Sequence, residues 1–235
     1  MSAKKMLGRV NYKTSLSGKT WLVGIELEEV VSFLPGQFVS LKVNKEGLRR
    51  SYSVASLPGK KTIDLVIDVS PMGEGSKYII DLKVGDSVEV LGFLGRFVVG
   101  EEVFATEKEL LFVGTGTGVV PLKPMIDNLL VNRNFRGQVH LVWGMRYESD
   151  LYWVKEIDKL QRDYENFHFE TVLSKPGNDW PGKQGHVGET IEKMSLQWKE
   201  MTAYLCGNPD MIVGVKELLL KKGVPEVQIF YERFA

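Results

Sequence analysis

The chain has 235 residues, 43% of them hydrophobic, which is enough for one large or two small globular domains with a buried core. Lys and Arg together number 30, as do Asp and Glu, so the chain lacks the strong positive field that attracts nucleic acid or an anionic membrane surface. A single cysteine, Cys206, excludes an internal disulfide, a cysteine-held zinc site and an iron–sulfur cluster ligated by four thiolates from these residues.

Up to about Gly100, short runs of alternating apolar and polar residues are separated by turn residues. Clear examples cover residues 20–28, 37–43 and 62–69. Such alternation is typical of strands in an antiparallel sheet that buries one face. One helix is expected to start near Glu74, before a further turn and strand. The first part of the chain is therefore predicted to be an antiparallel barrel.

The run RSYSVAS at residues 50–56 combines a cation, an aromatic ring and three serine hydroxyl groups on one predicted strand. Arg50 can hold a phosphate bidentately, Tyr52 offers a flat face to a planar heterocycle, and Ser53 can hydrogen-bond a ring nitrogen or carbonyl. Arg50 and Tyr52 share one face of a strand while Ser51 and Ser53 share the other, so a bulge or a strand end is needed for all to meet one ligand. In isolation, the tetrapeptide is also typical of an edge strand with a solvated arginine.

Gly73, Gly75 and Ser76 lie where the predicted helix begins. We expect them to open the helix and to offer a capping hydroxyl and free N–H groups as a second anion site. A diphosphate could then bridge this site and Arg50. A capped helix without a ligand is the alternative interpretation.

After Glu101 the pattern changes to apolar strands that alternate with longer amphipathic segments. This alternation is typical of a parallel sheet covered by helices. The change in composition between Gly100 and Glu107 predicts two domains, at residues 1–102 and 103–235. The alternating segments are residues 109–114, 119–133, 139–144, 150–164, 168–174, 202–207 and 209–223.

The run GTGTGVVP follows the first of these strands. Gly114, Gly116 and Gly118 allow a tight turn that brings backbone N–H groups near a phosphate at the next helix N-terminus. Pro121 falls in the first helical turn, where its missing N–H costs little. The spacing differs from the GxGxxG dinucleotide fingerprint, and glycines after a strand can serve only to make a turn. By itself the run predicts a phosphate or nucleotide site.

Cys206 ends an apolar strand and precedes GNP. A lone cysteine in such a position is usually buried packing, but the carboxyl end of a parallel strand is also where ligands bind in α/β sheets. His140, His168 and His186 are scattered without ligand spacing, so we expect no metal site. No stretch approaches the roughly 18 apolar residues of a spanning helix, and no signal peptide is evident, which predicts a cytoplasmic protein without membrane insertion or a nucleic-acid partner.

Six ordered motifs resemble those of the ferredoxin–NADP reductase superfamily, in the form of bacterial oxygenase reductases without a fused iron–sulfur domain. The resemblance implies an N-terminal antiparallel Greek-key β-barrel that binds flavin and a C-terminal α/β parallel-sheet domain that binds a nicotinamide nucleotide. The motifs are PGQFVSL (35–41), RSYS (50–53), GFLGRF (92–97), GTGTGVVP (114–121), CGNPDM (206–211) and the final YERF (231–234).

The resemblance also implies roles for individual residues. Arg50 would lie at the flavin phosphates, Tyr52 against the isoalloxazine and Ser53 near its reactive nitrogen. The catalytic residues would be Ser53, Cys206 and Glu232, with no metal ligand. The implied cofactor-binding residues are Arg50, Ser51, Tyr52, Ser53, Val66, Ile67, Gly73, Gly75, Ser76, Gly116, Thr117, Gly118, Pro121, Arg146, Cys206, Gly207, Asn208, Pro209 and Phe234.

The sequence departs from the family pattern in two places. Asp68 and Val69 stand where many members carry a basic residue, so one expected contact to the cofactor diphosphate is missing. The resemblance still favours FAD over FMN as the flavin. Phe234 is followed by alanine, whereas a terminal tyrosine often shields the flavin.

Arg146 and Lys175 are candidates to bind the 2′-phosphate of NADPH. NADH is favoured as donor, because residues 172–187 resemble the NADH-using oxygenase reductases.

The implied function is a flavin-dependent NAD(P)H oxidoreductase. It would pass a hydride from the nicotinamide to bound FAD and then single electrons to a separate ferredoxin, flavodoxin or oxygenase component. One alternative is a diffusible NAD(P)H-dependent reductase of free flavin, ferric chelates or quinones. Another is a noncatalytic docking subunit that retains the fold.

Overall fold

Two units make up the chain in a computed structural model that describes residues 4–105 and 108–234. Unit 1 holds the residues up to Val99 together with Lys123–Asn128, and unit 2 holds the rest. The predicted domain boundary at residues 102 and 103 stays a prediction, and the far limit of the composition change, Glu107, lies outside the described residues. Within the described residues, no helix has both the length and the apolar character needed to cross a membrane.

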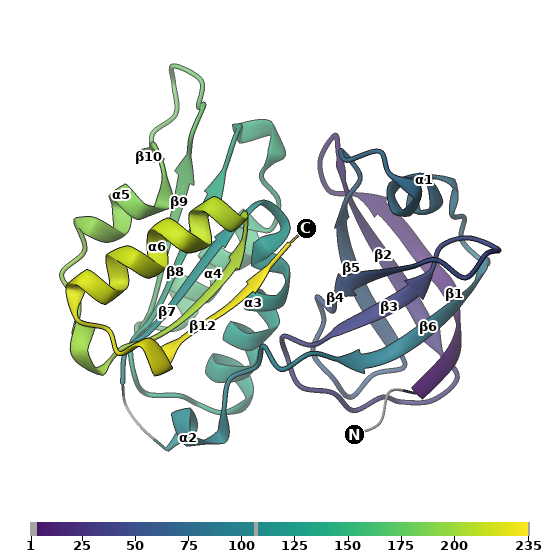
Figure 1. The fold of residues 1–235 in the computed structure, drawn as a ribbon, viewed down its shortest axis with the longest axis horizontal. Coiled ribbons are helices and arrows are strands. Elements are labelled where there is room, and N and C mark those ends of the chain that lie inside the picture. Colours follow the sequence, from purple (N-terminus) through teal and green to yellow (C-terminus); the bar gives the residue numbers. More distant parts are fainter. Residues whose placement is uncertain (1–3, 106–107, 235) are drawn as a thin grey trace. The chain divides into compact units, whose positions relative to one another are not determined.

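Unit 1 is a six-stranded antiparallel sheet that curls into a near-closed barrel (Figure 1). Its strand order is β4-β3-β6-β1-β2-β5, and an isolated bridge between Val54 and Leu65 joins the two edges. This confirms the predicted barrel. The elements are β1 Lys4–Ser15, β2 Thr20–Leu27, β3 Phe38–Lys42, β4 Arg49–Ser53, β5 Thr62–Asp68, α1 Glu74–Asp81 and β6 Ser87–Leu94.

Alternation along the strands builds the barrel core. In β5, Ile63 and Leu65 are fully buried while Asp64 between them is partly exposed. Val23 and Ile25 of β2 are fully buried in the same cluster. Because successive side chains of a strand point to opposite faces, this period of two fixes which face turns inward.

Unit 2 is a six-stranded parallel sheet with helices on its faces, as predicted. Its strand order is β10-β9-β8-β7-β11-β12. The strands are β7 Leu110–Thr115, β8 Val139–Met145, β9 Phe167–Leu173, β10 Lys183–Gln184, β11 Thr202–Gly207 and β12 Ile229–Arg233. The α-helices in this part of the chain are α2 Glu101–Phe104, α3 Val119–Asp127, α4 Val154–Asp163, α5 Val187–Glu192 and α6 Pro209–Lys222. The short helices are η1 Gly116–Gly118, η2 Asn128–Asn132, η3 Glu148–Asp150, η4 Trp198–Glu200 and η5 Glu226–Gln228. Residues 123–128 of α3 and η2 are the ones grouped with unit 1.

The helices α5 and α6 cover one face of this sheet (Figure 1). Ile191 of α5 and Leu219 of α6 pack on Leu111, Val113 and other aliphatic side chains of the strands. The chain leaves β7 in one direction through β8, β9 and β10, and later returns to place β11 and β12 on the other side. The strand order therefore reverses between β7 and β11, which is where ligands bind in open α/β sheets.

Candidate functional site

The predicted flavin motif of unit 1 lies on β4, the strand at one end of the sheet order. Arg50 and Tyr52 share one face of β4 and both reach the start of α1. A Cβ atom added at Gly75 would lie 2.7 Å from the Tyr52 hydroxyl and 2.9 Å from Cγ of Arg50. Glycine at this position lets both side chains approach the N-terminal turn of α1, whose free N–H groups favour an anion. The Arg50 guanidinium itself is exposed and donates to the backbone oxygen of Arg49 at 2.9 Å.

Tyr52 keeps its proton at physiological pH. Burial raises the pKa of its phenol to about 12, with the charge of Arg50 acting in the opposite direction and Tyr78 adding to the rise. The side chain is half-buried, so part of the ring stays accessible. A neutral, accessible phenol ring suits contact with a flat heterocycle.

Ser51 and Ser53 point to the other face of β4, as the strand period predicts. Ser51 is exposed and pairs with Ser40, while Ser53 is buried, ends the strand and pairs with Phe38. Their assignment to the cofactor stays a prediction.

Val66 and Ile67 are buried in β5, where they pair with Leu22 and Trp21 of β2. Ile67 belongs to the barrel core. Their expected contact with a cofactor likewise stays a prediction.

The prediction that a side-chain hydroxyl caps the start of α1 is wrong. The N-cap is Gly73, which has no side chain to form a cap, and the cap position carries no side-chain hydrogen bond. Ser76 lies within the first turn of the helix and is buried. The helix begins at Glu74, directly after Gly73. An anion at this helix start would therefore meet free backbone N–H groups, without a competing side-chain oxygen from a cap residue.

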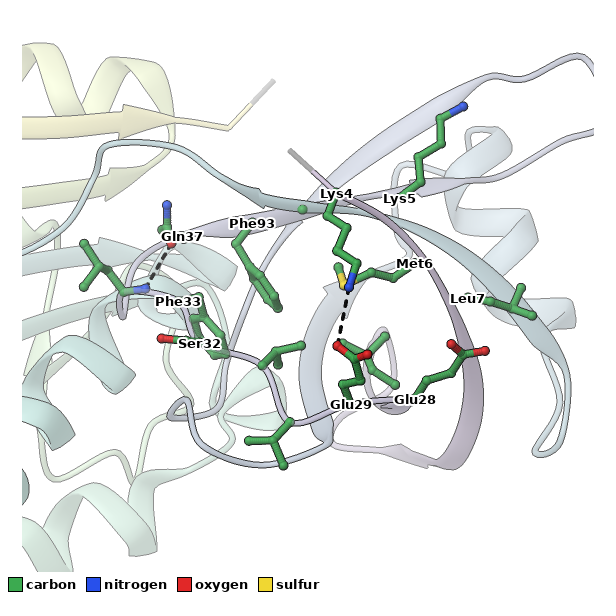
Figure 2. Close-up of a pocket in the computed structure, with 15 residues that line it drawn as sticks. Lys4, Lys5, Met6, Leu7, Glu28, Glu29, Ser32, Phe33, Gln37 and Phe93 are labelled. Carbon is green, nitrogen blue, oxygen red and sulfur yellow. Dashed lines mark hydrogen bonds and ion pairs between the residues drawn. The ribbon is translucent and has the colours of Figure 1, made fainter. Parts of the chain in front are cut away.

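A cavity of about 680 Å³ lies elsewhere in unit 1, between the first residues of β1, residues 27–34 and Phe93 of β6 (Figure 2). Phe33 and Phe93 stack with ring centroids 4.4 Å apart, and Lys4 pairs with Glu29 at 3.4 Å at its edge. The lining residues among those described include none of the residues that the sequence assigns to the flavin. The cavity and the predicted flavin site are thus separate parts of the barrel.

The glycine turn of unit 2 lies where the strand order reverses. A Cβ at Gly118 would lie 2.1 Å from the backbone oxygen of Cys206, so only glycine allows this approach to β11. Gly116 has φ +57°, a left-handed conformation that favours glycine. Thr117 is partly exposed between them, and Pro121 is buried in the first turn of α3. The turn thereby presents backbone N–H groups at a helix N-terminus, a geometry suited to phosphate.

Thr115 is a functional candidate that the sequence analysis missed. Its Oγ1 accepts a hydrogen bond of 3.0 Å from the backbone N–H of Asn208, which ties the end of β7 to the end of β11. Gly207, with φ +133°, leaves no room for a side chain, because a Cβ would lie 2.4 Å from that oxygen. The local signal is a β-branched hydroxyl residue directly before the glycine turn.

The segment after Cys206 starts α6. Asn208 is the N-cap, and its Oδ1 accepts hydrogen bonds from the N–H groups of Asp210 and Met211, while Pro209 occupies the first helical position. The N–H of Phe234 donates to the oxygen of Gly207 at 3.2 Å. The predicted residues of the CGNP segment and Phe234 are therefore neighbours in unit 2.

Cys206 and Glu232 form a pair across β11 and β12. The thiol is fully buried, and burial together with the nearby Glu232 charge raises its pKa far above the ordinary value. Burial also raises the pKa of Glu232, and its Oε2 is buried without a hydrogen-bond partner among the described residues. The pair offers a protonated thiol and a carboxyl group that readily holds a proton, and it disfavours a thiolate nucleophile.

Arg146 and Lys175 lie together at the carboxyl ends of β8 and β9. The N–H of Lys175 donates to the oxygen of Arg146 at 2.9 Å, and the Arg146 guanidinium lies 5.4 Å from the centre of the Tyr147 ring. Both side chains are exposed. The assignment of Arg146 to a cofactor stays a prediction.

Two of the three histidines, although far apart in the sequence, meet in the fold. His140 and His168 pair in register across β8 and β9, and their rings stack with centroids 4.9 Å apart. Sequence spacing hides this contact, because parallel strands bring residues 28 positions apart to the same level. His186 is exposed. Among the described residues, no group of three or more His, Cys, Asp or Glu side chains could hold a metal ion.

Two family models match the chain. The model described as "Oxidoreductase FAD-binding domain" matches residues 8–99, and the model described as "Oxidoreductase NAD-binding domain" matches residues 112–217. These ranges fall in the barrel and in the parallel-sheet unit. They agree with the predicted order of the two cofactor domains.

Curated relatives include electron transfer components of dioxygenases. The chain is 31% identical over 206 residues to the toluate 1,2-dioxygenase electron transfer component of Pseudomonas putida, covering 87% of this chain and 60% of the relative. It is 32% identical over 206 residues to the anthranilate 1,2-dioxygenase electron transfer component of Acinetobacter baylyi, covering 87% of this chain and 59% of the relative. The chain thus spans about 60% of the length of these relatives.

Solved structures share the fold along almost the whole chain. The Amycolatopsis cytochrome P450 reductase GcoB superposes with a TM-score of 0.92 at 26% identity, covering 99% of this chain and 70% of that one. A ferredoxin NADP+ reductase from Neisseria gonorrhoeae, solved with bound FAD and NADP, superposes with a TM-score of 0.87 at 20% identity, covering 98% of each chain.

Proposed function

Because the chain belongs to the ferredoxin–NADP reductase superfamily, with an FAD-binding and an NAD-binding domain, we propose that it is an electron-transfer reductase. It takes a hydride from NADH or NADPH onto bound FAD and passes single electrons to a separate protein. The observation that carries this proposal is the packing of Arg50 and Tyr52 on Gly75, which assembles a cation, a flat ring and a helix N-terminus on one face of the barrel.

The barrel residues bind and orient the flavin. Arg50 and the first turn of α1 would hold its phosphates, the Tyr52 ring would lie against the isoalloxazine, and Ser53 would donate a hydrogen bond near its reactive nitrogen. FAD, when bound, supplies the exchange between two-electron and one-electron chemistry. The remaining residues have the task of positioning and of excluding water, so no nucleophile is required of this chain.

In unit 2 the glycine turn holds the diphosphate of the nucleotide. Cys206 and Glu232 would lie at the nicotinamide, where the neutral thiol would give a close, uncharged contact and the carboxyl group, with its raised pKa, could hold a proton. The family resemblance makes Phe234 the candidate for an aromatic ring that shields the flavin. NADH is the favoured donor, with Arg146 as a candidate contact for the adenosine end of the nucleotide.

We propose an oxygenase component or a ferredoxin as the electron acceptor. The support is the similarity to two proteins whose names describe them as electron transfer components of dioxygenases. A diffusible reductase of flavin, ferric chelates or quinones would need no protein acceptor. A docking subunit without activity would be free to lose Arg50 and the glycines of the turn.

An anaerobic visible spectrum of the purified protein tests the proposal. We expect a flavin spectrum that bleaches rapidly after NADH and more slowly after NADPH, with FAD identified by chromatography of the released cofactor. Reoxidation by an added oxygenase component, faster than by free flavin or ferric chelate, would support the protein acceptor. A colourless protein that takes up neither FAD nor FMN would overturn the reductase and favour the docking subunit.

A further inference from the structure

Trp143 is fully buried in the centre of β8 and hydrogen-bonds the glycine turn. Its indole Nε1–H donates to the backbone oxygen of Gly116 at 2.9 Å. From this bond we propose that Trp143 is a positioning residue for nucleotide binding, because it fixes the orientation of the peptide group between Gly116 and Thr117. The inference rests on the proposed function, in which the turn holds the diphosphate.

Strand register explains why the indole reaches the turn. Trp143 pairs with Gly114 of β7, and paired residues of neighbouring strands project to the same face. A Cβ at Gly114 would lie 3.0 Å from the N–H nitrogen of Val119 and 3.2 Å from Leu122, so this face is the one covered by the start of α3. Gly114 has no side chain there, which lets the turn and the start of α3 pack directly on the strand, on the same face as Trp143.

Because a peptide group is planar, fixing the direction of the Gly116 carbonyl oxygen also fixes the direction of the Thr117 N–H. In a trans peptide, the C=O of one residue and the N–H of the next are antiparallel. Holding the Gly116 oxygen toward Trp143 therefore points the Thr117 N–H away from the indole. Gly116 has φ +57° and begins the short helix η1, so the bond from Trp143 acts together with the backbone of η1 to hold this peptide group.

The indole is held in place by aromatic contacts of its own. The Tyr152 ring meets it edge-on, with centroids 5.1 Å apart and planes at 71°, and the Trp153 ring meets Tyr152 in the same way at 5.2 Å. Tyr152 is buried, and Trp153 precedes the first residue of α4. The connection between β8 and α4 thus fixes the donor before any ligand binds, which lowers the cost of ordering the turn on binding.

The register also joins Trp143 to the predicted nicotinamide residues. Gly114 pairs with Trp143 on one side and with Cys206 on the other, and Cys206 pairs with Glu232. Trp143 therefore lies at the same level of the sheet as the Cys206–Glu232 pair, on neighbouring strands joined through Gly114. We expect the bond from Trp143 to affect nucleotide affinity and to leave the chemistry at Cys206 unchanged.

Trp143→Phe tests the proposal, because phenylalanine keeps an aromatic ring and removes the donor. We expect the Kd for NAD+ or NADP+, whichever the wild type binds more tightly, to rise roughly tenfold in calorimetric titration, the loss of one buried hydrogen bond. The limiting rate constant of flavin reduction at saturating nucleotide should stay within about twofold, since the bond contributes to binding and not to the hydride step.

Trp198→Phe is the matched control, since Trp198 packs beside Lys222 next to the start of β11, away from the turn. It should leave the Kd unchanged. If Trp143→Phe fails to fold, the isosteric benzothienylalanine at position 143 removes the donor alone. A wild-type Kd in either Trp143 variant overturns the role of Trp143 only. Absence of nucleotide binding by the wild-type protein overturns the proposed function with it.

Discussion

Gly118→Ala measures how tightly the glycine turn is held against β11. An added Cβ would lie 2.1 Å from the backbone oxygen of Cys206, 2.6 Å from its carbonyl carbon and 2.9 Å from Cα of Gly207. These atoms are backbone in a paired strand and cannot move aside as a flexible side chain can. The turn must shift by about 1 Å to restore ordinary contacts, and overpacking of this kind costs about 2–3 kcal/mol.

Differential scanning calorimetry provides the measurement. For a chain of this size the loss corresponds to a fall in Tm of roughly 5–10 °C. The shifted turn should also weaken binding of NAD+ in a calorimetric titration. Gly214→Ala is the control, because Gly214 lies in the middle of α6 with nothing within 4 Å of its Cβ position, and alanine there should stabilise the protein by about 0.5–1 kcal/mol. A Gly118→Ala protein as stable as the wild type would refute the close approach of the turn to Cys206.

Three further predictions concern single side chains. Arg50→Ala should weaken FAD binding roughly tenfold or more, through loss of a charge-assisted phosphate contact, without a change in the far-ultraviolet circular dichroism spectrum; full flavin occupancy after gel filtration would contradict this. Cys206→Ala should slow flavin reduction in stopped flow while the flavin content stays intact, and an unchanged reduction rate would remove the thiol from the reaction. Burial, with the nearby His168 adding to the effect, lowers the pKa of His140 to about 4. Since the unfolded chain takes up a proton at the ordinary histidine pKa near 6.5 and the folded chain does so only near pH 4, stability should fall by about 2.5 kcal/mol as the pH drops from 6.5 to 4. His140→Phe should remove that slope in urea unfolding curves, and an identical slope in the variant would assign it to other groups.

Local periodicity was sufficient to predict both sheets and the helix at Glu74. A period of two in residues 62–69 and buried aliphatic runs such as residues 111–113 depend only on near neighbours in the sequence. The start of α1 was less predictable. Whether Gly73 or a later residue caps the helix depends on where helical dihedral angles begin, so Ser76 was wrongly expected to act as a cap.

Contacts between distant residues could not be predicted from the sequence. The bond from Trp143 to Gly116 joins residues 27 positions apart, and it depends on the register of β7 and β8. The stacking of His140 on His168 depends in the same way on β8 and β9. Register follows from the packing of whole strands, which no single motif encodes.

The reversal of strand order between β7 and β11 also has a consequence for the order of folding. The glycine turn follows β7 directly in the chain, yet Thr115 bonds Asn208, 93 residues later. Contacts of such long sequence separation carry a large loop-closure cost and form late. The pairing of β7 with β8 can precede them, since β8 follows after a single helical connection. We therefore expect the turn to reach its final conformation only when β11 has joined the sheet, which would make the nucleotide site one of the last parts of unit 2 to form.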